Sequence, residues 1–443
     1  MKNRKLSVMA LAVSLVASHQ VSAQMLEEVI VTASKRAAGL QDIPIAVSVV
    51  SGDKIGEQGI DSLEDVAVFM PNVHIAEGGA GDQLFIRGIG SGINYGFEQS
   101  VGTFIDGVYF GRGQASRSSF LDLERVEVLK GPQSTLYGKN TVAGAVVISS
   151  AKPTDEFEGR VELTSEPELG SVGATLTLSG PVTDNLGARF VVKSEESDGY
   201  MRNTFSNRNE RQEENLVTRL TLAWDATDNL DIGFKYESGS SETLGRQDAI
   251  TIATPFAIGR YQAADPGFSA AFDYDKSSAN IAGNASDQQY HDSEWDIATL
   301  TAEWAIGEFT IKSITGYVDY QFDNYLDSDY GPLDFLARGR DEQHKQLTQE
   351  ITLFSPTGQT LEYMAGIFYQ DEELAHKRFT DVKLSAAGIQ PSGIWDASGP
   401  SAFNQDASTL SAFAQLTVNA SDNLRVIAGL RYSRDEKEFT KAG

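Results

Sequence analysis

The chain has 443 residues, 62 of them acidic and 36 basic, which gives a formal net charge of −26 at pH 7. So large a negative charge disfavours nucleic acid or an anionic surface as a general partner, although acidic loops could bridge divalent cations or attract cationic ligands. The sequence has no cysteine and five histidines, none of them paired at metal-ligand spacing. Disulfides, thiolate metal sites and cysteine nucleophiles are therefore excluded, and we expect neither a metal centre nor a cofactor.

The first 23 residues have the pattern of a secretion signal. Cations precede an apolar run and a small-x-small cleavage pattern: Lys2, Arg4 and Lys5, then residues 6–17, then residues 21–23. The alternative, an N-terminal membrane anchor, is disfavoured because the apolar run is shorter than the ~20 residues that span a bilayer. No later segment is apolar for long enough to form a transmembrane helix. We expect an exported chain that starts at Gln24 after cleavage.

Two regions precede the long second half of the chain. Residues 24–38 form a polar leader without glycine, and residues 39–152 are rich in glycine and short apolar runs. One helix is predicted at residues 60–69, where Asp61 or Ser62 can cap the first turn. Near the end of this region a short strand, a Gly-Pro break and an apolar strand follow one another. Residues 39–152 are therefore predicted to form a compact α+β domain.

From about residue 157 apolar and polar side chains alternate. Leu220 and Leu222 point one way, for example, while Arg219 and Thr221 point the other. One apolar and one polar face over about ten residues is typical of a transmembrane β-strand, and about eleven such strands are predicted. A soluble antiparallel sheet with one wet face is the alternative. The number of strands, with no helix predicted to cover them, favours an antiparallel transmembrane β-barrel.

The connections between these strands differ in length. Three short turns have nearly the same sequence, Thr/Ser-Asp-Asn-Leu: residues 183–186, 227–230 and 421–424. Long polar connections are expected between the other strand ends: residues 197–214, 240–292, 322–344 and 371–407. Asp and Asn tolerate the backbone conformations of tight turns. Short turns at one end and long loops at the other are typical of the periplasmic and extracellular ends of a membrane barrel.

The size of the first domain indicates a larger barrel than eleven strands can form. Strands ~4.8 Å apart and tilted ~40° close at a diameter of about 22 Å for eleven strands and about 44 Å for twenty-two. A compact domain the length of residues 39–152 is roughly 35 Å across. Only the larger barrel holds it, so residues 157–443 are expected to be a barrel that is incomplete at its C-terminus.

No catalytic constellation is visible in the sequence. Adjacent glutamates such as Glu195 and Glu196 face opposite ways in an extended strand and suit acid–base work poorly. No Gly-x-Ser-x-Gly nucleophile elbow stands on a strand–helix turn. We therefore expect a protein that is not an enzyme.

Four motifs in order resemble the plug domain of TonB-dependent outer-membrane receptors: residues 71–73, 85–90, 104–108 and 125–151. The last of them runs from Arg125 through Gly131-Pro132 to Ala151. The departures are small: Phe104 stands where tyrosine is commoner, and Ser134 and Lys139 where glycine and arginine are commoner. The motifs extend over about 120 residues, which makes the resemblance specific.

The leader also resembles a motif of this family, the TonB box, at Glu28, Val29, Ile30, Val31 and Thr32. An extended β-branched run of this kind suits addition as a strand to the edge of a partner's sheet. By the resemblance, the periplasmic protein TonB would bind here and use the inner-membrane proton gradient to drive transport.

The resemblance implies a 22-stranded β-barrel with the plug inside it, in the cell outer membrane of a Gram-negative bacterium. It implies TonB-dependent import, most often of a ferric siderophore or other iron complex. Uptake of oligosaccharide, cobalamin or another nutrient is the first alternative, and a passive porin or structural barrel is an alternative of another class. The expected partners are TonB, an extracellular ligand, outer-membrane lipid and lipopolysaccharide, without nucleic acid, and we expect a monomer. The motifs that carry the resemblance do not identify which compound is transported.

Two further sets of site residues follow from the resemblance. Plug loops facing outward suggest five substrate contacts: Asn94, Tyr95, Arg112, Gln114 and Arg117. Arg112 and Arg117 would suit an anionic ferric chelate, whereas the alternative is that all five are solvated loop tips. A plug–barrel lock is expected from Arg87 and Arg125 with Glu350 as barrel partner. The alternative is that both arginines bind local carbonyls and Glu124 or Glu127.

Overall fold

The computed structural model describes a large part of the chain, with several gaps. The described residues are 30–32, 34–36, 38–76, 83–91, 99–112, 120–268, 276–277, 279, 289–385, 396–421 and 423–442. The predicted secretion signal lies outside these residues. The chain divides into two compact units, Met1–Pro44 and Ile45–Gly443. In the first unit β1 (Ile30–Val31) pairs antiparallel with β2 (Ala38–Gly39).

The second unit begins with an α+β part, which we call the plug (residues 45–152). Its main sheet has the strand order β3-β9-β10-β7-β8, with β10 and β7 parallel and the other pairs antiparallel. The strands are β3 (Ala46–Ser51), β7 (Val101–Ile105), β8 (Val108–Phe110), β9 (Leu123–Lys130) and β10 (Gly144–Ser150). A smaller sheet consists of β4 (Val73–Ala76), β5 (Gln83–Ile86) and β6 (Ile89–Gly90). The strands expected near the end of this region are β9 and β10.

Three short helices belong to the plug: α2 (Gly52–Gln58), α3 (Leu63–Val68) and α4 (Ser134–Tyr137). The predicted helix is confirmed as α3, where the Ser62 hydroxyl caps the first turn by accepting from Asp65 N at 3.1 Å. Helix α2 was not predicted, because its two glycines are poor helix formers. Capping by Ser51 favours it nonetheless.

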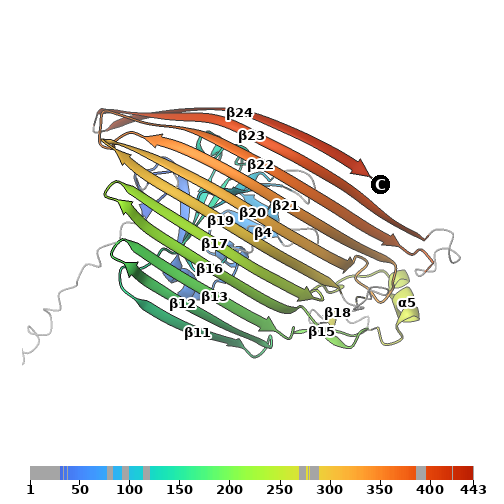
Figure 1. Cartoon of the computed structure of the whole chain (residues 1–443). Helices are drawn as coiled ribbons and strands as arrows, with labels where there is room; N and C mark the ends of the chain where they lie inside the picture. Colours follow the sequence, from blue (N-terminus) through green and yellow to red (C-terminus); the bar gives the residue numbers. More distant parts are fainter. Residues whose placement is uncertain are drawn as a thin grey trace, which may run out of the picture. The chain divides into compact units, whose positions relative to one another are not determined.

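The rest of the second unit is a single sheet of eleven antiparallel strands in sequence order (Figure 1). Its strands are β11 (Glu158–Glu166), β12 (Ser171–Thr183), β13 (Leu186–Ser197), β16 (Gln212–Thr227), β17 (Leu230–Leu244), β19 (Tyr290–Ile306), β20 (Phe309–Asp327), β21 (Leu336–Phe354), β22 (Leu361–Val382), β23 (Ala397–Ser421) and β24 (Leu424–Ala442). The predicted strand number is confirmed. The plug elements lie on one side of this sheet.

Most of the strands of this sheet are longer than the ten residues expected, those from β16 onward by five residues or more, and two of the expected long loops are short. Strand β20 continues to Asp327 and β21 starts at Leu336, so most of residues 322–344 is strand. Residues 371–407 likewise belong largely to β22 and β23. The prediction was wrong because the alternation continues with polar side chains on both faces once the strands pass the apolar belt. Polar composition was therefore mistaken for a loop.

The connection between β17 and β19 contains a helix, α5 (Pro255–Ala264), in a region where none was predicted. Thr254 caps it by accepting from Ala257 N at 3.2 Å, and Pro255 starts it. A small sheet lies in the outer connections as β14 (Met201–Asn203), β15 (Arg208–Glu210) and β18 (Lys276–Ser277). Among the described helices, none combines the length and the apolar character needed to cross a membrane.

The repeated Thr-Asp-Asn-Leu sequence has one structural explanation. In two of the three turns the threonine hydroxyl donates to the asparagine side chain, at 2.9 Å for Asn185 and 2.8 Å for Asn229. The asparagine then donates from Nδ2 to the next strand, to Asp225 O and Ala305 O respectively. Each turn thereby binds the following hairpin. The third turn contains Asp422, which lies outside the described residues.

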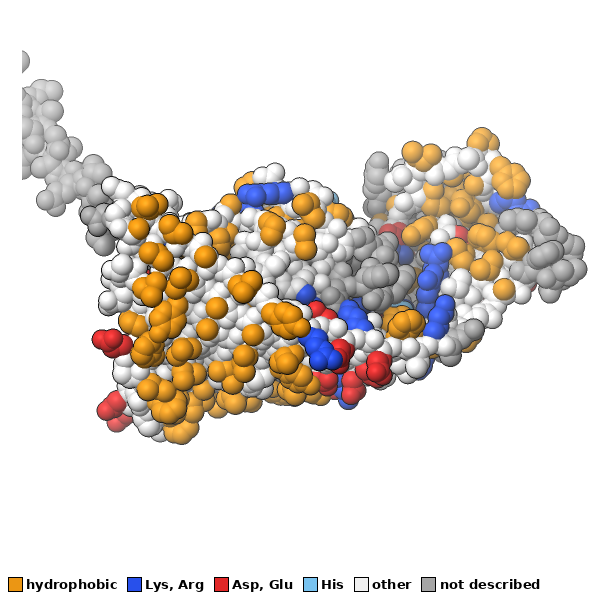
Figure 2. All heavy atoms as spheres, turned by 90° about the horizontal axis from the view of Figure 1, so that it is seen from above, with side chains coloured by type: hydrophobic (Ala, Val, Ile, Leu, Met, Phe, Trp, Pro, Cys, Tyr) orange, Lys and Arg blue, Asp and Glu red, His pale blue; other side chains and the backbone are white. Residues whose placement is uncertain are grey.

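The outer face of the sheet is apolar and carries aromatic side chains at two levels. Trp224, Trp304, Phe309 and Tyr363 lie near the short turns, and Tyr236, Tyr317, Tyr369 and Tyr432 lie further along the strands, all of them exposed. Hydrophobic side chains spread over a broad area of the surface in view in Figure 2. Two aromatic levels around an apolar belt are typical of a strand bundle that crosses a bilayer.

The hydrophobic core is shared between the plug and the inner face of the sheet. Plug residues such as Ile105 and Val126 pack in the same buried cluster as Ile297 and Trp295 of β19. One close approach is at Gly316 of β20, where an added Cβ would lie 2.5 Å from both methyl carbons of Val108. The plug hairpin therefore lies directly on the inner face of the sheet.

We expect Gly316→Ala to destabilise the protein by ~1–3 kcal/mol, because the new methyl group overpacks the contact with Val108. Thermal unfolding in detergent measures the effect. Gly233→Ala is the matched control, since Gly233 is also in a strand and its nearest neighbour would be Thr301 Cβ at 3.8 Å. Equal melting temperatures for Gly316→Ala and wild type would show that the plug does not pack on β20 as described.

Candidate functional site: the contact between plug and barrel strands

The hairpin of β7 and β8 turns at Asp106 and Gly107. Ile105 pairs with Val108, so the turn has two residues, and their φ angles are 49° and 84°. Positive φ at both positions is typical of a type I′ hairpin turn, which aspartate and glycine favour. The Asp106 carboxylate accepts from Ser150 N and Ser150 Oγ, both at 2.8 Å. These bonds fix the carboxylate at the edge of the plug.

Lys235 of β17 binds this carboxylate from the inner face of the sheet. Its ammonium also donates to Ser150 Oγ at 3.3 Å. Burial by itself would raise the pKa of Asp106, but the charge and hydrogen bond of Lys235 outweigh it and hold the pKa below the ordinary value. Asp106 is therefore ionised, and the contact is an ion pair between a buried lysine and a carboxylate that is 22% exposed.

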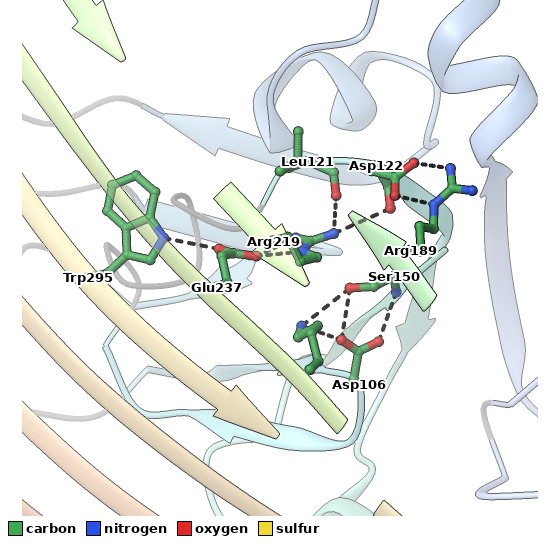
Figure 3. A network of polar contacts seen from close by, with 9 residues as sticks. Asp106, Leu121, Asp122, Ser150, Arg189, Arg219, Glu237 and Trp295 are labelled. Atoms are coloured by element: carbon green, nitrogen blue, oxygen red, sulfur yellow. Dashed lines mark hydrogen bonds and ion pairs between the residues drawn. The ribbon is translucent and has the colours of Figure 1, made fainter. Parts of the chain in front are cut away.

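A second ion pair joins Asp122, just before β9, to Arg189 of β13. The guanidinium donates from Nε at 2.7 Å and from Nη2 at 2.6 Å to the two carboxylate oxygens (Figure 3). Two parallel bonds between a guanidinium and a carboxylate fix direction as well as distance. This pair orients the segment that leads into β9.

Arg219 of β16 makes the third contact between sheet and plug. Its Nη1 donates to the backbone carbonyls of Leu121 and Asp122. Its Nε and Nη2 donate to Glu237 Oε2 at 2.7 and 2.5 Å, and the other oxygen of Glu237 accepts from Trp295 Nε1 at 3.0 Å (Figure 3). The side chains of Arg219 and Glu237 are 1% and 0% exposed. This is a buried network whose members depend on one another.

These three cations, Arg189, Arg219 and Lys235, form what we call the cationic triad. Arg189 and Lys235 both lie opposite Thr221 of β16, so they stand at one level of the sheet. Each binds an acidic side chain or a carbonyl of the plug. The triad therefore fastens the plug to three neighbouring strands through contacts of one polarity.

A contact of the opposite polarity follows β8. Arg112 of the plug donates from Nε to Glu342 Oε1 at 2.9 Å and from Nη2 to Oε2 at 2.8 Å, and His376 Nδ1 lies 3.2 Å from Oε2. Burial would lower the pKa of Arg112, but the charge of Glu342 raises it above the ordinary value. Gln346 of β21 also donates to the Tyr109 carbonyl at 2.5 Å. The hairpin of β7 and β8 is thus held near both its turn and its outgoing end.

The predicted substrate contacts are only partly described. Asn94, Tyr95, Gln114 and Arg117 lie outside the described residues. Arg112 is described, and it binds Glu342 of β21 instead of standing as a solvated loop tip. A role for Arg112 in ligand binding stays a prediction.

The predicted TonB box is also partly described. Glu28 and Val29 lie outside the described residues, whereas Ile30 and Val31 form β1 and the Thr32 carbonyl accepts from Lys35 N at 2.8 Å. Ile30 and Val31 are therefore extended, as strand addition requires, and Thr32 begins a turn.

The predicted lock residues lie in three places. Arg125 donates to Glu127 at 2.7 Å and also pairs with Glu124, its neighbour on β9. Arg87 lies beside Gly131 of the plug and, among the described residues, forms no ion pair with a barrel glutamate. The carboxylates that Arg125 contacts are those named in the alternative, and a lock formed by Arg87 and Arg125 stays a prediction.

Glu350 faces the plug from β21. Burial, together with the charges of Glu127 and Glu350, raises the pKa of Tyr137 in α4. Tyr137 is therefore close to both carboxylates, one from the plug and one from the sheet. The structure brings Glu350 near the same half-buried tyrosine as Glu127, the partner of Arg125, and a lock between Glu350 and Arg125 stays a prediction.

Sequence reasoning did not find the cationic triad or its plug partners. It placed Arg219 on the polar face of a strand and quoted Asp106 only within a family motif. A usable signal was present, because a cation on the face of a membrane strand that turns away from lipid needs water or a partner. Which plug carboxylate it meets depends on contacts across more than ninety residues of chain, as the 97 residues between Arg219 and Asp122 illustrate.

Within the parts of the chain that the structure describes, no group of three or more His, Asp or Glu side chains could hold a metal ion. The polar contacts found instead join one structural part to another.

Two segments of the chain match known family models. Residues 39–145 match the TonB-dependent receptor plug domain, and residues 245–443 match the TonB-dependent receptor-like β-barrel. A sheet of long membrane strands fastened to an internal α+β domain defines a plugged outer-membrane barrel. The chain belongs to the TonB-dependent receptor family, which is a class of outer-membrane receptors and not of enzymes. It is a protein of the Gram-negative outer membrane.

Individual relatives match parts of the chain. The iron-regulated outer membrane virulence protein of Vibrio cholerae is 26% identical over 193 residues, covering 39% of this chain and 28% of that protein. The ferrioxamine B receptor of Salmonella typhimurium is 28% identical over 205 residues, covering 44% of this chain and 27% of that protein. The matched segments thus span less than a third of these relatives.

The fold is similar to that of solved receptors. The ferric yersiniabactin uptake receptor FyuA from Yersinia pestis has a TM-score of 0.73 at 19% identity, covering 90% of this chain and 57% of that one. Pseudomonas aeruginosa FpvA, solved in complex with pyoverdine and iron, has a TM-score of 0.69 at 16% identity, covering 93% and 55%. The chain spans little more than half the length of these receptors, and the likeness concerns the fold.

Proposed function

We propose that the protein imports a ferric siderophore or another iron complex across the outer membrane, driven by TonB. The observation that carries this proposal is the plug fastened to the inner face of the strands by the cationic triad and by Arg112. A passive porin needs a path that stays open, whereas a fastened plug needs an energy source to move it. The outer membrane has no ATP, and a pull from TonB supplies that energy.

Iron is supported by what relatives are known to take up and not by residues of this chain. The ferrioxamine B receptor and the ferric yersiniabactin uptake receptor are both named for iron chelates. One relative favours another cargo: the vitamin B12 transporter BtuB of Vibrio vulnificus is 25% identical over 190 residues. Cobalamin import by the same machinery is therefore the second candidate.

We also propose which partners the protein binds and how it is assembled. TonB binds Glu28, Val29, Ile30, Val31 and Thr32 as an added strand. The complete barrel has 22 strands and acts as a monomer without catalysis. Its apolar belt contacts outer-membrane lipid, and lipopolysaccharide contacts the strand ends beyond the second aromatic level, which consists of Tyr236, Tyr317, Tyr369 and Tyr432.

If TonB binds residues 28–32 as an added strand, Ile30→Pro should abolish import without weakening ligand binding. Proline cannot donate a backbone hydrogen bond and is poorly tolerated in a paired strand. Radioactive iron bound at the cell surface and iron accumulated in cells are measured separately, with Ile30→Val as the control that keeps a β-branched strand former. Accumulation by Ile30→Pro at the wild-type rate would show that this segment is not the TonB contact.

A further inference from the structure

The inner face of the sheet changes from apolar to polar between β20 and β21. The inward side chains of β20 are aromatic or aliphatic, or absent at the glycine: Phe322, Tyr320, Val318, Gly316 and Ile314. Six successive inward side chains of β21 are polar, and five of them are buried: Glu342, His344, Gln346, Thr348, Glu350 and Thr352. The next strand, β22, adds two buried polar side chains, Gln370 and Glu372. We call six of these residues the polar strip: Glu342, His344, Gln346, Thr348, Gln370 and Glu372.

The apolar contact between plug and sheet ends at the same place. The large buried cluster that they share includes side chains of β13, β16, β19 and β20 but, among the described residues, none of β21 or β22. The plug meets the polar strip through groups such as the Tyr109 carbonyl, which accepts from Gln346. At Gly111 an added Cβ would lie 3.4 Å from Gln346 Oε1 and 3.6 Å from both carboxylate oxygens of Glu372. Water can therefore replace the plug on the strip more readily than on β19 or β20, where apolar side chains would become exposed.

Two polar atoms of the strip are unpaired while the plug covers them. His344 Nδ1 and Gln370 Oε1 are buried and, within the described part of the chain, have no hydrogen-bond partner. A buried polar atom without a partner raises the free energy of the state in which it is buried. Water entering between plug and strip would supply the missing partners, so these two atoms favour hydration of the contact.

The carboxylates of the strip keep partners within the sheet when the plug moves away. Glu342, which binds an arginine of the plug, also lies 3.2 Å from His376 Nδ1. Glu372 contacts His344 Nε2 at 3.2 Å and Gln370 Nε2 at 3.1 Å. Withdrawal of the plug from the cationic triad, by contrast, would separate two cations of the sheet from the plug carboxylates that they bind.

The plug strand that contacts the strip is β8, which lies at the edge of the main plug sheet. It has three residues, and in that sheet it pairs with β7 alone. Its hairpin turn is held at Asp106 by Lys235, whereas Gly111 lies beyond its other end. An edge strand this short can separate at the cost of few hydrogen bonds, while the rest of the plug sheet stays paired.

We propose that the pull from TonB moves β8 away from β21 and β22 and opens a water-filled passage along the polar strip, while the plug keeps its contacts with β13, β16, β17 and β19. This inference rests on the proposed function and assigns the part of the described wall along which the cargo crosses. The donors and acceptors of the strip can replace the hydration of a polar cargo, which an apolar wall cannot do. The passage therefore suits a hydrophilic iron chelate.

The chain contains no cysteine, so a single introduced thiol reports where water enters. Thr348→Cys on β21 and Thr299→Cys on β19 are matched variants. Both threonines lie directly opposite Gly316, on either side of it, and they are 3% and 4% exposed. Neither has a short hydrogen bond to lose, since Thr299 Oγ1 has no partner among the described residues and Thr348 Oγ1 lies 3.5 Å from the Gly316 carbonyl oxygen.

Cells that make either variant are treated with a water-soluble maleimide that does not cross lipid. They are given a radioactive ferric trishydroxamate or triscatecholate, whichever wild-type cells accumulate. We expect labelling of Thr348→Cys to accelerate by about tenfold or more during import, because the thiol is reached from the open passage, and labelling of Thr299→Cys to change by less than about twofold. Withholding the chelate, TonB or the proton gradient should return Thr348→Cys to its resting rate. Accumulation of iron at the wild-type rate shows that each variant is folded.

Equal acceleration in both variants would show that the plug also leaves β19, and would overturn the proposal. Acceleration in Thr299→Cys alone, or in neither variant while iron accumulates, would overturn it too. TonB-dependent accumulation together with any of these results retains the proposed function and refutes the passage alone. Wild-type cells that accumulate neither chelate would contradict the proposed function itself, and the passage with it.

Discussion

Lys235→Ala is expected to loosen the plug, because it leaves the ionised Asp106, whose side chain is only 22% exposed, without the cation that contacts it. Removing one partner of a buried ion pair typically costs ~3–5 kcal/mol, since the desolvated charge remains. The cost should appear as a lower denaturant midpoint for the protein in detergent. It should also appear in cells as sensitivity to a large antibiotic that the outer membrane normally excludes.

Lys345→Ala is the control for this change. Lys345 pairs with Asp319 at 3.4 Å on the outer face and is 54% exposed, so its removal should cost at most about 1 kcal/mol. Asp106→Asn/Lys235→Met should recover part of the lost stability, because the buried charge is gone with its partner. If Lys235→Ala unfolded at the same denaturant concentration as the Lys345→Ala control, the contact between Lys235 and Asp106 would contribute nothing to the free energy of unfolding.

Arg219→Ala is expected to have an effect of the same size by a different route. It leaves the Glu237 carboxylate, which is 0% exposed, without the guanidinium that binds it, and removes the donor to the Leu121 carbonyl. We expect a loss of ~3–5 kcal/mol in unfolding free energy, because a buried carboxylate is left without its counter-ion. Proteolysis of the native protein should show faster cleavage within the plug, because the segment before β9 loses its attachment.

The pair can be separated from the network by a double-mutant cycle. Glu237→Gln keeps the shape and hydrogen bonding of the side chain, so Arg219→Ala/Glu237→Gln should be more stable than Arg219→Ala alone. Arg160→Ala is the surface control, since Arg160 and Glu162 pair at 2.6 Å with both side chains largely exposed. Additive effects of Arg219→Ala and Glu237→Gln would contradict the coupling that the geometry predicts.

The features predicted from sequence are those that local chemistry determines. Apolar and polar side chains, such as Leu220 and Arg219, alternate along a single strand. This alternation correctly predicted eleven strands and the two faces of the sheet. The Asp-Asn turns were found because each turn satisfies itself and the next strand through its own side chains. Helix α3 was found because Ser62 caps it locally.

The features that sequence did not predict depend on the environment. The outer halves of β20 to β23 look like loops because both faces are polar beyond the apolar belt, yet the ladder with neighbouring strands keeps them extended. The contacts of the plug depend on which strand faces which carboxylate. Arg87 and Arg125 were chosen by family resemblance, whereas Arg189, Arg219 and Lys235 are the cations placed against Asp106 and Asp122.

The central claim is that a plug fastened to the barrel strands is moved by TonB to admit an iron complex. Accumulation of radioactive iron, supplied as one bound chelate, tests it most directly in cells with and without TonB and with and without a proton gradient. We predict accumulation only when both are present, with equal surface binding in all four conditions. Accumulation at an undiminished rate in cells that lack TonB would contradict the account.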